Sequence, residues 1–182
     1  MSLNFDTAIE RSRFAARQAF LARQSALRLD LAEGITFQPE TEESVEDQVT
    51  ETLWAEGKTP DAVDAGELAD ARASFAVLAP RREASGRSIA ATLMLGFPDA
   101  VRNQRLAALQ GFPDQVQLEL SDGSLVQPVV DRGTAGPDDR LPAVLALRYL
   151  LPDGKQIAAL VSHHDEAPGR WPAPAAWTAW SS

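Results

Sequence analysis

The sequence feature that most constrains the fold is a largely apolar run at residues 89–95, IAATLML. Apolar side chains occupy both alternating faces of this run, which is typical of a strand that is covered on both sides. The tetrapeptide Gly-Phe-Pro-Asp follows the run at residues 96–99 and recurs at residues 111–114. We therefore expect the stretch 87–130 to form the centre of the fold.

The two Gly-Phe-Pro-Asp copies are predicted to have opposite roles. The first ends the strand and begins a short helix, with Pro98 near the first helical position and Asp99 in the first turn. Gly111 then ends that helix, so the second copy leads out of a helix and into a strand. The residues after the two copies have different periods, and we interpret the copies as punctuation rather than as a duplicated motif.

The remaining strand signals lie mostly in the second half of the chain. Alternating apolar residues predict strands, Asp122-Gly123 predicts a tight hairpin turn, and the Leu-Pro-Asp-Gly sequence ending at Gly154 predicts a second hairpin. Near the start, Pro39 closes a short strand that we expect at a sheet edge. The predicted strands are residues 35–39, 89–95, 116–120, 125–130, 143–151 and 156–161.

Helices are predicted mainly in the first half of the chain. An amphipathic helix is expected over residues 5–28. Ser44 resembles the N-cap of a second helix that ends near Glu56, and residues 59–61, Thr-Pro-Asp, begin a third that reaches about residue 78. The predicted class is α+β, a mostly antiparallel sheet with helices packed on one face, plus the N-terminal amphipathic helix.

A chain of 182 residues is long enough for one domain with a single core. We predict an N-terminal helical segment over residues 1–34, an α+β core over residues 35–166 and a C-terminal tail over residues 167–182. The sequence contains no cysteine, which excludes disulfides and thiolate ligands. No apolar run is long enough to span a bilayer, so we expect a cytoplasmic protein without membrane contact.

Charge is unevenly distributed. Residues 1–28 hold five arginines against Asp6 and Glu10, whereas residues 29–71 hold thirteen acidic residues against Lys58 alone. We expect these segments to attract each other, within one chain or between two. The formal net charge of −9 argues against nucleic-acid binding, because phosphate neutralisation needs a cationic surface.

Two segments suggest contact with a partner or a second copy of the chain. Phe14 and Leu21 form an apolar line on the N-terminal helix, nearly opposite its main apolar stripe. The tail holds Trp171, Trp177 and Trp180. Tryptophans in such a tail either lie across the domain's own apolar surface or dock on a partner, where they are favoured anchors.

Acid–base or metal chemistry has one candidate cluster, at the end of the last predicted strand: His163, His164, Asp165 and Glu166. Imidazoles and carboxylates that converge on one point can hold a metal or exchange protons. Adjacent strand residues point to opposite faces, so convergence requires a turn there. The alternative is that both histidines are structural or solvent-exposed. The acidic residues between Glu40 and Glu51 are interpreted as a solvated helix face rather than as a cation site.

Arginines supply the candidate anion sites. Arg81 and Arg82, together with Arg87, flank a polar connector before the central strand. Arg148 interrupts the apolar run VLALRYLL, and a guanidinium there needs a carboxylate or solvent because an unpaired buried charge is costly. We expect a structural ion pair for Arg148, with anion binding as the alternative.

An ordered set of short motifs resembles an uncharacterised bacterial "domain of unknown function" family over roughly residues 40–150. The matching residues are Glu46–Val49, Glu51 and Leu53, then Ala91, Thr92 and residues 96–99, then Arg105, Leu106, Leu109 and Gly111, and finally Val144 and residues 147–149. Members of that family are often encoded near rubrerythrin-like and iron–sulfur redox proteins, which implies an accessory role. Other members carry histidine where this chain has Leu145, which removes a ligand role at that position.

Phosphate-loop, Rossmann and serine-elbow motifs are absent from the sequence. The leading interpretation is a non-catalytic domain that works through protein contact, as a homodimer or with a protein partner and without a cofactor. Two alternatives stay open: a metal-dependent or acid–base enzyme that uses His163 and His164, and a small-anion binding module.

Overall fold

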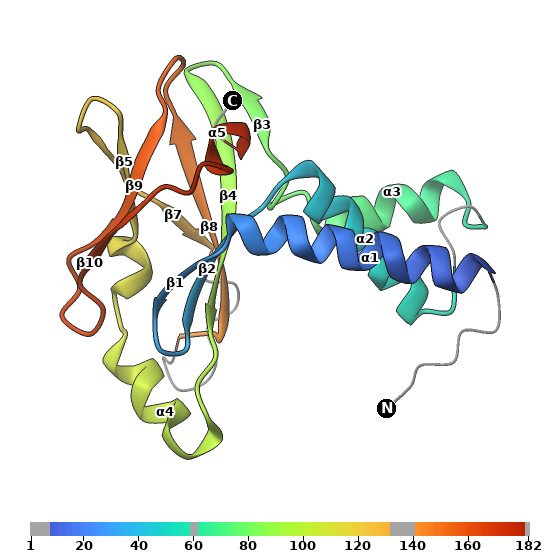
Figure 1. The fold of residues 1–182 in the computed structure, drawn as a ribbon, viewed down its shortest axis with the longest axis horizontal. Coiled ribbons are helices and arrows are strands. Elements are labelled where there is room, and N and C mark those ends of the chain that lie inside the picture. The colour runs from blue at the N-terminus through green and yellow to red at the C-terminus, as the bar shows by residue number, and fades with distance from the viewer. Residues whose placement is uncertain (1–7, 59–61, 132–140, 181–182) are drawn as a thin grey trace.

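The computed structural model describes residues 8–58, 62–131 and 141–180, with side chains from residue 15 onward and without the side chain of Ala179. Two antiparallel sheets face each other, and the long helices lie on the outer side of the larger sheet (Figure 1). The predicted α+β class and its antiparallel pairing are confirmed, and the strands divide between the two sheets.

The larger sheet has the order β1-β2-β4-β8-β7. β3 pairs with residues 86–88 of β4, which extend beyond the residues that pair with β2. The smaller sheet has the order β10-β9-β5-β6. The strands of the larger sheet are β1 (Leu29–Ala32), β2 (Ile35–Pro39), β3 (Arg81–Glu83), β4 (Gly86–Leu95), β7 (Val129–Asp131) and β8 (Val144–Leu151). Those of the smaller sheet are β5 (Gln117–Leu120), β6 (Leu125–Val126), β9 (Ile157–Ser162) and β10 (Gly169–Pro172).

The apolar run that dominates the sequence is the central strand, β4. It pairs with β2 on one side and with β8 on the other. Ile89 and Leu93 face the second sheet, while Ala90 faces the helices, and all three are fully buried. The prediction that this strand is covered on both faces is therefore confirmed.

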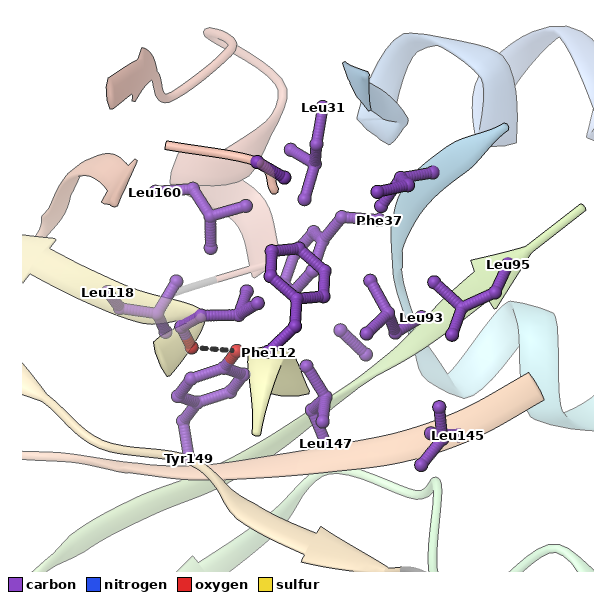
Figure 2. Close-up of a cluster of buried hydrophobic side chains, with 14 of the residues drawn as sticks. Leu31, Phe37, Leu93, Leu95, Phe112, Leu118, Leu145, Leu147, Tyr149 and Leu160 are labelled. Atoms are coloured by element: carbon purple, nitrogen blue, oxygen red, sulfur yellow. Dashed lines mark hydrogen bonds between the residues drawn. The ribbon is translucent and has the colours of Figure 1, made fainter. Parts of the chain in front are cut away.

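The core fills the space between the two sheets (Figure 2). Leu118 and Leu160 from the smaller sheet meet Phe37 and Leu147 from the larger one. Burial raises the pKa of the Tyr149 phenol well above its ordinary value, and its hydroxyl donates a hydrogen bond to the Val116 carbonyl at 2.8 Å.

Three strand predictions are wrong, two of them because the chain passes from one sheet to the other. β2 is not an edge strand, because β1 pairs with its outer side. The predicted strand 125–130 is split near Pro128 into β6 and β7, one in each sheet. The turn before Gly154 joins β8 to β9 without pairing them, because these strands also lie in different sheets. The chain changes sheet at both points.

The helices are α1 (Ala8–Leu27), α2 (Glu42–Ala55), α3 (Ala65–Ser74), α4 (Asp99–Ala108) and α5 (Trp177–Trp180). Thr41, not Ser44, is the N-cap of α2, and Ser44 returns the hydrogen bond in a capping box. Asp64 caps α3, and the predicted start at residues 59–61 lies outside the described residues. The first Gly-Phe-Pro-Asp leads into α4, and the second forms a 3-10 turn (Phe112–Gln115) before β5, as predicted.

Candidate functional site

His164 is engaged through both ring nitrogens. Its Nε2 lies 3.0 Å from the Gln110 carbonyl oxygen, and its Nδ1 accepts a hydrogen bond from the Glu166 amide at 3.2 Å. This pattern fixes the proton on Nε2, so neither nitrogen keeps a lone pair for a metal in this conformation. The ring meets Phe112 edge-on and joins the end of β9 to the turn after α4.

The neighbours of His164 point elsewhere. His163 and Asp165 are exposed, and Glu166 forms an ion pair with Arg105 at 3.1 Å. Within the described part of the chain, no group of three histidine, aspartate or glutamate side chains is placed to hold a metal ion. The four-residue candidate cluster is therefore not brought together on one point.

Arg148 lies on the helix-facing side of the larger sheet. Its Nη1 donates to the Ser88 hydroxyl at 2.8 Å, and its buried Nη2 has no hydrogen-bond partner among the described residues. Burial lowers the pKa of the guanidinium and nearby Arg81 lowers it further, whereas Glu83 and Asp131 act in the opposite direction. The expected ion pair is not found among the described residues.

Among the described residues, the most deeply buried carboxylate is one that the sequence places within an ordinary acidic run. Glu40 follows β2, and its side chain is enclosed where β2, α2 and β4 meet. Its oxygens accept hydrogen bonds from Thr92 at 2.5 Å, Ser44 at 2.6 Å and Gln48 at 3.2 Å. The sequence predicts that the acidic run is a solvated helix face. Glu40 does not fit that prediction, because three uncharged donors surround its carboxylate in place of water.

Other members of that acidic run hold α1 against α2. Arg17 pairs with Asp47 and Arg23 pairs with Glu43. Each arginine has a raised pKa, caused first by its hydrogen bond to the carboxylate. The predicted attraction between the basic and acidic segments thus occurs within one chain.

This pairing predicts a dependence on pH. The Arg23 hydrogen bond lowers the pKa of Glu43, so the pair stabilises the fold above the ordinary glutamate pKa and loses that contribution as pH falls through the lowered value. Between pH 5 and pH 3 (a range set by the ordinary pKa of about 4.3), wild type should lose more unfolding free energy than Arg23→Gln. Equal losses in urea titrations of the two proteins would contradict this.

The tryptophan tail lies on its own domain. Trp177 and Trp180 are 1% and 2% exposed and pack against Phe37. Their indoles donate to the Leu27 carbonyl at 2.6 Å and to the Glu40 carbonyl at 3.0 Å. Of the two alternatives for the tail, the structure shows the first for these two side chains, which pack on their own domain. Trp171, on β10, is half-buried.

The N-terminal helix leaves one side open. Ala15, Gln18, Ala19, Ala22 and Ser25 are all exposed, and we call this set the α1 outer face. Leu21 flanks it and is 43% exposed. The side chain of Phe14 lies outside the described residues. Figure 1 shows α1 running away from the sheets alongside α2.

Arg81 and Arg82 lie on β3, next to the start of β4. Arg81 is 3.7 Å from Glu83, and Arg82 forms an ion pair with Asp153 at 2.9 Å. Arg87, directly opposite Arg82 in the strand register, lines two neighbouring cavities. The structure thus spreads the sequence-predicted anion candidates over two places: Arg81 lies near Arg148, whose partner Ser88 is opposite it in register, and Arg82 lies opposite Arg87.

Residues 3–167 match a family described as "Protein of unknown function (DUF3501)". The chain belongs to the DUF3501 family. The match is wider than the span of roughly residues 40–150 that carried the resemblance in the sequence.

A solved structure has the same fold as this DUF3501 chain. It is a novel protein of unknown function from Burkholderia pseudomallei, 22% identical, with a TM-score of 0.72. The similarity covers 99% of this chain and 98% of the other. At that identity the likeness shows the fold alone. A search of curated proteins gives no match.

The motif residues of this DUF3501 chain mostly hold the fold together. Gln48 and Thr92 both donate to Glu40, and Arg105 lies over the Phe97 ring at 5.2 Å. Leu145, where the family resemblance suggested histidine in other members, is buried between the sheets. Among the helices described, none is both long and apolar enough to cross a bilayer.

Proposed function

We propose that this protein is a non-catalytic interaction domain that pairs with a second copy of itself through the α1 outer face. The observation that carries the proposal is the exposure of this face on a helix whose opposite side is buried. Phe20, Gln24 and Leu27 are at most 9% exposed, whereas the outer residues reach solvent. The outer side of a surface helix normally carries charged residues, whereas this face consists of small and uncharged residues that a second helix can pack against.

Charge favours a second copy as the occupant. The charged residues between positions 15 and 26 are Arg17 and Arg23, and both are bound to α2. The α1 outer face is therefore uncharged on a chain whose formal net charge is −9. Two such faces can meet without repulsion, and the alanines permit close approach of the two helix axes.

The titratable side chains support a non-catalytic role through the contacts that they make. His164 is held by the Gln110 carbonyl and the Glu166 amide, and Glu40 is surrounded by three donors. The family resemblance, with its rubrerythrin-like and iron–sulfur neighbours, makes redox proteins the first class of partner to test for an accessory role.

The molar mass of the protein in solution tests whether it forms this dimer. We expect wild type to have twice the mass of the chain in size-exclusion chromatography with light scattering, and Ala22→Glu to be monomeric, because the change places two like charges at the centre of a symmetric contact. Ala69→Glu, the same substitution at an exposed position of α3, should leave the dimer intact.

Circular dichroism and thermal melting should show that both variants fold, since glutamate is a good helix former. A monomeric wild type at micromolar concentration, or an Ala22→Glu protein that stays dimeric, would overturn the proposal.

A further inference from the structure

Two neighbouring cavities share one arginine. The larger, about 670 Å³, lies between α1, the start of α2 and the C-terminal tail; Leu27, Pro80, Ala176 and Trp180 give it a mainly apolar wall. The smaller, about 240 Å³, lies at the turn after β8 and is lined by Arg82, Lys155 and Thr178, among others. Arg87 borders both.

Arg87 differs from the other cations of these cavities. Arg23 is bound to Glu43, Arg82 to Asp153 and Lys155 to Asp122. In the described part of the chain, Arg87 has neither an ion pair nor a side-chain hydrogen bond. It is nevertheless half-buried, so its guanidinium is partly removed from water without a compensating acceptor.

The backbone on either side of Arg87 determines the position of this residue. Gly86 turns the chain from β3 into β4 with φ 151°, and a Cβ at that position would lie 2.0 Å from the Leu151 carbonyl oxygen. A side chain therefore does not fit at Gly86. Arg87 is held between Arg82 and Leu151 in the strand register, where Arg82 is a like charge directly opposite. A bound anion would relieve that repulsion.

We propose that the larger cavity binds an amphipathic carboxylate, whose apolar body lies along Leu27 and Trp180 and whose carboxylate pairs with Arg87. A volume of about 670 Å³ falls in the range of small-molecule sites. The planar guanidinium fork matches a carboxylate with two parallel hydrogen bonds. Glu42 and Glu43 line the same cavity, which favours a singly charged anion over a phosphate of higher charge.

Decanoate is a suitable probe, because it combines a flexible apolar chain with a single carboxylate. Isothermal titration should show saturable binding to wild type, and the emission of Trp180 at the cavity wall should change. Acetate, which lacks the apolar chain, and decanol, which lacks the charge, should both bind about tenfold more weakly or worse.

The variants separate charge from shape. Arg87→Gln should weaken decanoate binding by about tenfold or more, because it removes a charge-assisted hydrogen bond. Arg87→Lys should bind with intermediate affinity, since it keeps the charge but loses the fork. Ala26→Trp, at an exposed cavity position of α1, should also weaken binding by filling the space.

Arg102→Gln, on α4 and outside both cavities, is the matched control and should bind as wild type does. All proteins are titrated without further changes, and light scattering before and after decanoate is added separates binding from self-association. Equal binding by Arg87→Gln and Arg102→Gln, or no binding of decanoate by folded wild type, would overturn the proposal.

Discussion

Replacing Trp177 with alanine should lower the free energy of unfolding by about 3–5 kcal/mol, the cost of removing a large aromatic side chain from a packed core. The indole is 1% exposed, lies 5.5 Å from Phe37 and 5.1 Å from Trp180 between ring centres, and donates to the Leu27 carbonyl. Urea unfolding with an unchanged m-value would measure the loss.

Two further tryptophan variants sharpen this prediction. Trp177→Phe keeps a ring but removes the hydrogen-bond donor to the Leu27 carbonyl. Its free energy of unfolding should therefore lie between those of wild type and Trp177→Ala. Trp171→Ala is the matched control, because Trp171 is half-buried and should cost less. If Trp177→Ala and Trp171→Ala are equally stable, the tail does not have the structural role assigned to it.

Replacing Glu40 with alanine should lower the free energy of unfolding by about 2–4 kcal/mol, because three donors lose a charged acceptor that is itself buried. Thr92 and Gln48 would then lose their acceptor, whereas the Ser44 hydroxyl would keep the Thr41 carbonyl at 2.9 Å. Glu40→Gln should cost less, since its carbonyl oxygen retains part of the network. The measurement is again equilibrium unfolding at pH 7.

Thr92 provides the control for this site. Thr92→Ser keeps the hydroxyl that donates to Glu40 and should be nearly neutral, whereas Thr92→Val keeps the shape and loses the donor. A Glu40→Ala protein as stable as wild type would mean that burying the carboxylate already cancels its hydrogen bonds, an outcome known for buried charges.

Features that depend on neighbouring residues were predictable from the sequence. The apolar run at residues 89–95 identified the central strand, because a strand covered on both sides cannot alternate. Both Gly-Phe-Pro-Asp copies were interpreted correctly, since proline and glycine act on the local backbone. One boundary differs even here: the N-cap of α2 is Thr41, three residues before the predicted cap Ser44, because these two residues share one capping box.

Features that depend on distant pairing were not predictable. β1, β3 and β10 have four residues or fewer, and each exists because a longer strand offers it an edge. Glu40 looks like an ordinary acidic residue until Thr92, 52 positions later, arrives beside it. The cavity at Arg87 has the same origin, because its walls come from α1, α2 and the tail.

The two indole hydrogen bonds also order the events of folding in time. Trp177 reaches a carbonyl 150 positions earlier and Trp180 one 140 positions earlier. During synthesis, the end of α1 and the β2–α2 junction therefore wait for residues 177–180 to leave the ribosome. Until then apolar surface around Phe37 stays uncovered, and exposed apolar surface of this kind makes an incomplete chain prone to aggregation. The native state of this fold thus requires residues 177–180.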